Sequence, residues 1–105
     1  MYAVIRTYLG TGAKQLFELL EERNVDIEAT LRKVPGLVSY TLLRQGDGGM
    51  SVTVCTDKAG ADESVKVARD WIQENAAWPG VPPASNIGAS PPVVTQGSVI
   101  VQING

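Results

Sequence analysis

The stretch of sequence that decides the fold runs from Pro35 to Thr56 and reads Pro-Gly-Leu-Val-Ser-Tyr-Thr-Leu-Leu-Arg-Gln-Gly-Asp-Gly-Gly-Met-Ser-Val-Thr-Val-Cys-Thr. Two segments of it, Leu37–Leu43 and Met50–Thr56, alternate in character and contain many β-branched residues, which predicts two strands. The residues between them are rich in glycine, which adopts positive φ angles easily, and Asp47 can bond the turn backbone. The stretch therefore predicts a β-hairpin.

The segments on either side of the hairpin extend this into an alternating order of strands and helices. Apolar residues at spacings of four and seven, from Leu16 to Leu31, predict an amphipathic helix before the hairpin. The other predicted elements are a strand over Tyr2–Leu9, that helix over Ala13–Lys33, a second helix over Ala59–Ala76 capped by Asp57, and a last strand over Val93–Asn104. The order β-α-β-β-α-β predicts an α+β, ferredoxin-like fold, an antiparallel four-stranded sheet with two helices on one face.

The first predicted strand has no plainly polar face. Alternation places Tyr2, Val4, Arg6 and Tyr8 on one face and Ala3, Ile5, Thr7 and Leu9 on the other. The face with Tyr2, Val4, Arg6 and Tyr8 is too apolar to lie in water, so we expect it to pack against a second copy of the chain. The sequence thus predicts a homodimer.

Length and charge narrow the class of protein. A chain of 105 residues predicts a single domain, 1–105, with a modest core. The net charge of −2 and the absence of a basic stripe argue against nucleic acid as a partner. No signal-like start and no apolar run of about 18 residues are present, so we expect a cytoplasmic protein that does not cross a membrane. The single cysteine, Cys55, cannot form an internal disulfide, and an inert buried thiol is the expectation for it.

One long segment, Ala77–Pro92, is rich in proline and has no charged residue. Unstructured connections longer than about 12 to 15 residues are uncommon in compact domains unless they are functional or mobile. The sequence leaves open whether this loop is a lid, a dimer contact or a plain connector.

The order of elements, the Val-Pro-Gly-Leu-Val-Ser-Tyr entry to the hairpin, the Gly-Asp-Gly-Gly turn and the Asp-Trp-Ile-Gln-Glu-Asn segment of the second helix carry a family resemblance. The chain resembles the dimeric α+β barrel superfamily, and within it the antibiotic biosynthesis monooxygenase-like group. The resemblance implies a ferredoxin-like subunit whose sheet pairs with that of a second subunit, with a pocket between each sheet and its helices. It does not imply one activity, because the superfamily includes cofactor-independent oxygenases, haem-degrading enzymes, isomerases and proteins of no known activity.

The inventory of reactive residues excludes several kinds of site. The chain contains no histidine, so it lacks the usual general base, the usual metal ligand and the proximal ligand of haem-degrading relatives. Serine or cysteine triads that need histidine are excluded, and no spacing of cysteine and carboxylates predicts a metal site. We expect no cofactor and no metal. Gly10-Thr11-Gly12 and Gly46-Asp47-Gly48-Gly49 are interpreted as turns, since neither matches a phosphate-binding loop.

The remaining candidates for ligand binding are polar and aromatic: Arg6, Tyr40, Trp71, Asn75 and Trp78. Arg6 could bind an anionic ligand or pair with an acidic residue across the dimer. Tyr40 could anchor a ligand with its phenol or pack in a strand. Trp71 and Asn75 resemble the tryptophan and asparagine of oxygenase relatives, although in the haem-degrading group the asparagine lies on strand one. Trp71 could instead be core, Asn75 could end the helix, and Trp78 stands at the entrance to the long loop.

Two functions fit this set, and the sequence leaves open whether the protein is an enzyme. The first is a dimeric barrel that binds a small apolar or aromatic molecule between sheet and helices, which the missing acid–base residues favour. The alternative is a cofactor-independent monooxygenase or isomerase acting on a polycyclic or phenolic metabolite. In that case the substrate supplies the electrons and the pocket supplies orientation and desolvation.

Overall fold

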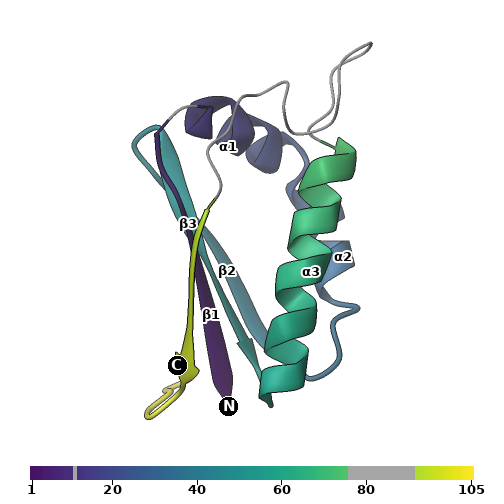
Figure 1. Ribbon diagram of the computed structural model, residues 1–105, viewed down its shortest axis with the longest axis vertical. Helices are drawn as coiled ribbons and strands as arrows, with labels where there is room; N and C mark the ends of the chain where they lie inside the picture. Colours follow the sequence, from purple (N-terminus) through teal and green to yellow (C-terminus); the bar gives the residue numbers. More distant parts are fainter. Residues whose placement is uncertain (11, 76–91) are drawn as a thin grey trace.

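A computed structural model describes residues 1–10, 12–75 (residue 75 by its backbone alone) and 92–105. Four strands form one antiparallel sheet in the order β2-β3-β1-β4. The elements of the described residues are β1 (Tyr2–Tyr8), α1 (Ala13–Glu22), α2 (Asn24–Leu31), β2 (Leu37–Gln45), β3 (Gly48–Cys55), α3 (Lys58–Asn75) and β4 (Val93–Ser98). All three helices lie on the same side of the sheet (Figure 1). The predicted ferredoxin-like fold is confirmed, with one helix more than expected.

The helix predicted over Ala13–Lys33 is two helices, because the backbone leaves helical geometry at Arg23 (φ −107°, ψ 25°). The Asn24 side chain donates a hydrogen bond to the Glu21 carbonyl oxygen at 2.6 Å, which satisfies one of the carbonyls at the end of α1. The predicted apolar stripe survives the break: Leu16, Leu20, Ile27 and Leu31 are all buried. The break therefore changes the direction of the chain without exposing its apolar face.

The hairpin turn is shorter than predicted. Gln45 and Gly48 are paired in the ladder, so only Gly46 and Asp47 lie between the strands, and Gly46 has φ +59°. Gly49 belongs to β3, where a Cβ atom would lie 2.6 Å from a Phe17 ring carbon. Of the glycines in this segment, Gly46 serves the turn and Gly49 makes room for the core.

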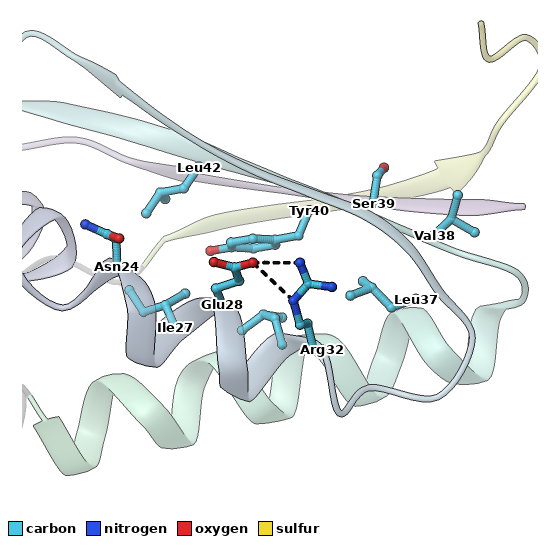
Figure 2. Close-up of a pocket in the computed structure, with 10 residues that line it drawn as sticks. Asn24, Ile27, Glu28, Arg32, Leu37, Val38, Ser39, Tyr40 and Leu42 are labelled. Atoms are coloured by element: carbon cyan, nitrogen blue, oxygen red, sulfur yellow. Dashed lines mark hydrogen bonds and ion pairs between the residues drawn. The ribbon is translucent and has the colours of Figure 1, made fainter. Parts of the chain in front are cut away.

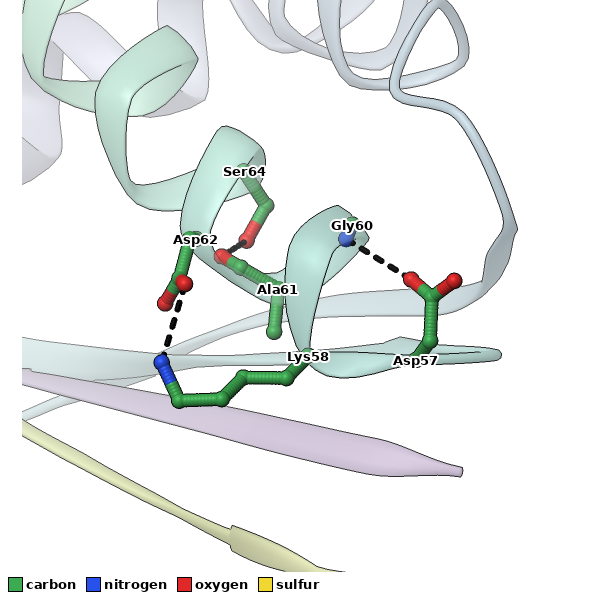
Figure 3. Close-up of polar contacts among 6 residues, drawn as sticks. All are labelled: Asp57, Lys58, Gly60, Ala61, Asp62 and Ser64. Carbon is green, nitrogen blue, oxygen red and sulfur yellow. Dashed lines mark hydrogen bonds and ion pairs between the residues drawn. The ribbon is translucent and has the colours of Figure 1, made fainter.

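Helix α3 begins as predicted with Asp57, whose carboxylate accepts a hydrogen bond from the Gly60 backbone N–H at 2.9 Å (Figure 3). Lys58 and Asp62 form an exposed ion pair one turn apart, and this contact lowers the pKa of Asp62. Further along α3, Trp71 is buried in the core, one of the two roles that the sequence left open for it. The buried side of α3 therefore includes Trp71.

The sequence prediction for the two faces of β1 is wrong: the helices cover the face that was expected to pack against a second copy of the chain. Val4, Arg6 and Tyr8 are buried inside the single chain, where they meet the helices, so this face is not the one left for a partner. The opposite face carries Ala3, Ile5 and Thr7 of β1. The register places beside them, on the other strands, Ser39, Thr41, Leu43, Met50, Val52, Val54, Val93 and Thr95. None of these residues is charged.

Strand β4 ends at Ser98, well before the predicted Asn104. Among the described residues it pairs with β1 alone, and Ser98 lies opposite Tyr2, the first residue of that strand. One further bond joins the Val99 N–H to the Met1 carbonyl oxygen at 3.0 Å. Beyond it, Ile100, Val101 and Ile103 are largely exposed. Without a neighbouring strand the remaining residues cannot continue the ladder.

Candidate functional site

Three strands aim the polar residues of the candidate site into the space between sheet and helices. Ser51 of β3 is paired with Arg6 of β1 on one side and with Leu42 of β2 on the other. Directly opposed residues of an antiparallel ladder project to the same face, so Arg6, Ser51 and Leu42 form one row. Tyr8 and Tyr40 lie one alternation further along their strands on that same face.

A cavity of about 390 Å³ lies between α2 and β2. The Tyr40 ring projects from β2 over the Glu28–Arg32 pair of α2 (Figure 2). The lining residues are Asn24, Ile27, Glu28, Leu31, Arg32, Leu37, Val38, Ser39, Tyr40 and Leu42. Both polar and apolar side chains border this outer cavity, as in many small-molecule sites.

A second, much smaller void of about 20 Å³ lies deeper, under α3. It is lined by Arg6, Tyr8, Leu20, Ile27, Leu31, Tyr40, Leu42, Ser51, Ala68, Trp71 and Ile72. Ile27, Leu31, Tyr40 and Leu42 border both spaces. The inner void and the outer cavity are therefore separated by a wall of four side chains, of which Tyr40 is the largest.

Arg6 is the charged group of the inner void. It is 5% exposed, and its Nε has no hydrogen-bond partner among the described residues. Its guanidinium carbon lies 5.4 Å from the centroid of the Tyr8 ring, a cation–π contact. A buried cation normally has an anionic partner, so this arrangement leaves positive charge unbalanced at the inner end of the site.

The two tyrosines beside Arg6 are held in their neutral form. Burial raises the pKa of Tyr8 to about 12 although the Arg6 charge opposes the shift, and burial raises the pKa of Tyr40 in the same way. Neutral phenols donate hydrogen bonds and are poor general bases near pH 7. These residues can orient a ligand, but they are not set up to remove a proton from it.

The charged groups of the outer cavity compensate each other. Arg32 donates two hydrogen bonds to Glu28 Oε1, at 3.1 Å from Nε and 2.6 Å from Nη2 (Figure 2). Both side chains are largely exposed, so the pair adds little to stability. Its effect on the site is to leave this cavity close to neutral.

Trp71 closes the inner void from α3. It is 7% exposed and belongs to the core cluster with Leu20, Ile27 and Leu31. The guanidinium of Arg23, at the break between α1 and α2, lies over its ring. Trp71 therefore has both of the roles considered from the sequence, since it packs in the core and borders the inner void.

The structure brings together three of the five candidates: Arg6, Tyr40 and Trp71 all line the inner void. Asn75 is the last residue of α3, and its side chain lies outside the described part of the chain, as does Trp78. The loop predicted over Ala77–Pro92 also falls outside it, apart from Pro92. Because Arg6 faces the helices of its own chain, it does not lie on the open face where a second sheet would pack.

Sequence reasoning missed Tyr8, Ser51 and the Glu28–Arg32 pair. Tyr8 could have been identified from the sequence, because it shares a strand face with Arg6. Ser51 required the register between β1 and β3, and Glu28 and Arg32 required the position of α2 over β2. Cys55 is buried as expected, and burial raises the pKa of its thiol, with Asp57 adding to the shift.

Neither a metal-ion cluster nor a helix fit for crossing a membrane occurs in the described residues. No group of three or more cysteine, aspartate or glutamate side chains within them is placed to hold a metal ion. None of the helices in the described ranges combines the length and apolar character that a membrane crossing requires.

The fold is similar to that of several solved structures. A dimeric ferredoxin-like protein from an uncultured marine organism is 12% identical, with a TM-score of 0.62, covering 99% of this chain and 96% of that chain. MhuD of Mycobacterium tuberculosis, a heme-degrader with two hemes bound in its active site, is 15% identical, with a TM-score of 0.57 and 98% of both chains covered. ActVA-Orf6 of Streptomyces coelicolor, a monooxygenase in complex with the ligand nanaomycin D, is 19% identical, with a TM-score of 0.54, covering 99% of this chain and 91% of that chain.

No protein-family model matches the sequence, and no protein of curated function matches it. At identities this low, similarity of structure establishes the fold and leaves the activity open. At the level of the fold, the predicted likeness is confirmed: the chain shares its ferredoxin-like fold with solved structures that include a monooxygenase and a heme-degrader.

Proposed function

We propose that this chain is a homodimeric binding protein that takes a small apolar or aromatic molecule between its sheet and its helices. The observation that carries the proposal is the wall formed by Tyr40, Ile27, Leu31 and Leu42, which separates a cavity of about 390 Å³ from a void with polar groups at its inner end. An apolar lining with a few convergent polar groups is the usual composition of a ligand pocket. The structural neighbours support the proposal, since MhuD and ActVA-Orf6 hold heme and nanaomycin D respectively.

The proposal of a homodimer rests on the open face of the sheet. Ile5, Leu43 and Val93 are exposed there, and none of the residues that the register places on this face is charged. The apolar residues Ile100, Val101 and Ile103, after the end of β4, extend the uncovered surface. Covering these groups with a second copy removes apolar area from water, which favours association.

Calorimetric titration with 2-naphthamide, an uncharged aromatic probe, tests the binding proposal. We expect saturable binding that Tyr40→Ala weakens by about tenfold, because the variant removes an aromatic wall of the site. The matched control is Val25→Ala: Val25 lies on α2, is exposed, lines neither space and is not on the open face of the sheet, so its truncation should leave affinity unchanged. Equal weakening by both variants, or no binding to the wild type, would contradict the proposed site.

A second candidate is a cofactor-independent monooxygenase or isomerase acting on a polycyclic or phenolic compound. The buried cation of Arg6 favours it, since a positive charge without a carboxylate partner stabilises a phenolate or enolate form of a substrate. Oxygen uptake with an anthrone, measured against the uncatalysed rate, distinguishes the two functions. Uptake that depends on the protein and falls in Arg6→Met would identify an oxygenase, whereas binding without uptake supports the first function.

A further inference from the structure

The charge of Arg6 has no counterpart within its own chain. All 11 acidic residues lie in the described ranges, and no ion pair joins any of them to Arg6 there. The stretch of residues 76–91, which the structure does not describe, contains no aspartate or glutamate. The missing counter-ion is therefore not a side chain of the same molecule.

Nearby groups compensate the buried charge only in part. The ring of Tyr8 is a weak substitute for an anion, because its attraction for a cation comes from a quadrupole and not from a net charge. No group in ranges 1–10, 12–75 and 92–105 accepts a hydrogen bond from Arg6 Nε, although this atom is buried and the residue borders the inner void. An unsatisfied charged donor at the end of a pocket is what an anionic ligand group would complete.

We propose that Arg6 is an anion subsite at the inner end of the pocket, and that the ligand is an aromatic carboxylate. This inference rests on the binding function proposed above and specifies the class of ligand. Ser51, paired with Arg6 across the ladder and 4% exposed, and the phenols of Tyr8 and Tyr40 are neutral donors that line the inner void together with Arg6. The aromatic body of the ligand fills the outer cavity, and its carboxylate passes the Tyr40 wall to reach the guanidinium.

The sizes and charges of the two spaces support this orientation of the ligand, with its carboxylate inward and its aromatic body outward. The inner void, at about 20 Å³, holds no more than a group the size of a water molecule before its walls move, whereas the outer cavity has room for a ring system. The outer arginine, Arg32, is already bound to Glu28, so the outer cavity offers no unbalanced cation. A carboxylate is therefore attracted inward past Tyr40 and not held at the mouth.

The test compares two probes of nearly equal shape, 2-naphthoate and 2-naphthamide, by calorimetry near pH 7. We expect the wild type to bind the naphthoate at least about tenfold more tightly, the difference that a charge-assisted hydrogen bond produces. Arg6→Met, which keeps the length of the side chain, should abolish the preference while its affinity for the naphthamide changes by less than about threefold. Arg32→Met should keep the preference.

Each other outcome has a distinct meaning. If both probes bind the wild type equally, or if the preference disappears in Arg32→Met and remains in Arg6→Met, the anion subsite is wrong and the binding function stands. If neither probe binds the wild type, both proposals fail. Should Arg6→Met not fold, as judged by circular dichroism, Arg6→Lys replaces it; this variant keeps the charge but loses the Nε donor, so a preference reduced by several-fold is expected and an unchanged one contradicts the role of Nε.

Discussion

The guanidinium carbon of Arg23 lies 5.8 Å from the centroid of the Trp71 ring, so the break between α1 and α2 is packed directly onto α3. The helices α1, α2 and α3 lie on the same side of the sheet (Figure 1), and this contact joins the break between the first two to the third. The Arg23 guanidinium lies over one face of the indole. Trp71 also belongs to the core cluster that contains Leu20, Ile27 and Leu31. The position of α3 over the sheet therefore depends on Trp71.

Trp71→Ala should lower the free energy of unfolding by about 3 to 5 kcal/mol, because the surrounding core cannot collapse fully into the space left by an indole. Chemical denaturation measures this change. Val25→Ala, a truncation at an exposed position of α2, is the control and should change stability by less than about 0.5 kcal/mol. A loss below about 1 kcal/mol for Trp71→Ala would mean that the indole faces an open pocket and is not packed.

Association should depend on the open face of the sheet. Ile5→Glu places a charge in the middle of that face, and we expect it to weaken the dimer by at least about a hundredfold, measured by light scattering over a concentration series. Val25→Glu adds the same charge on α2 and should leave the dimer unchanged. A wild-type protein that is monomeric at micromolar concentration would contradict the proposed sheet-to-sheet association.

The protein should lose stability in alkaline solution through Tyr8. The pKa of this phenol is about 12 in the folded protein and about 10 when unfolded, so the neutral side chain stabilises the fold fully below pH 10. As pH rises from 10 to 12, that contribution, about 2 to 3 kcal/mol for two pKa units, is lost. The difference in free energy of unfolding between the wild type and Tyr8→Phe should be constant below pH 10. As pH rises toward 12, the wild type should lose stability relative to the variant, which cannot ionise.

Burial also raises the pKa of Tyr40. Tyr40 is present in both the wild type and Tyr8→Phe, so it contributes the same pH dependence to each. Only the difference between them reports on Tyr8. A constant difference from pH 8 to pH 12 would show that the Tyr8 phenol titrates alike in the folded and unfolded states.

Gly49→Ala should destabilise the fold by about 1 to 3 kcal/mol, the usual cost of inserting a methyl group into a packed core. The added Cβ would meet the Phe17 ring at 2.6 Å and the Leu43 carbonyl oxygen. Gly97→Ala is the matched control in β4, where nothing lies within 4 Å of the new atom. Thermal melting compares the two variants, and we expect a lower melting temperature for Gly49→Ala than for Gly97→Ala. Equal melting temperatures would mean that Phe17 moves aside without cost.

The sequence by itself determined the local structure of this protein. Alternation in Leu37–Leu43 and Met50–Thr56 specified the hairpin, the apolar spacing from Leu16 to Leu31 specified helix, and Asp57 specified where α3 begins, because each depends only on neighbouring residues. The order of these elements was then enough to predict the ferredoxin-like fold. Arg6, Tyr40 and Trp71 were recognisable because polar and aromatic residues among apolar neighbours are conspicuous.

Only the tertiary structure decided which surfaces those elements cover. Both faces of β1 are mainly apolar, so periodicity alone could not show that the helices would cover Arg6 and Tyr8 and leave Ile5 open. The end of β4 depended on the length of its neighbour β1, and the break at Arg23 depended on how α2 packs against α3. Arg6, Ser51, Tyr40 and Trp71 lie on four separate elements, and their meeting at one void follows from strand register and helix packing, which are interactions between residues distant in the sequence.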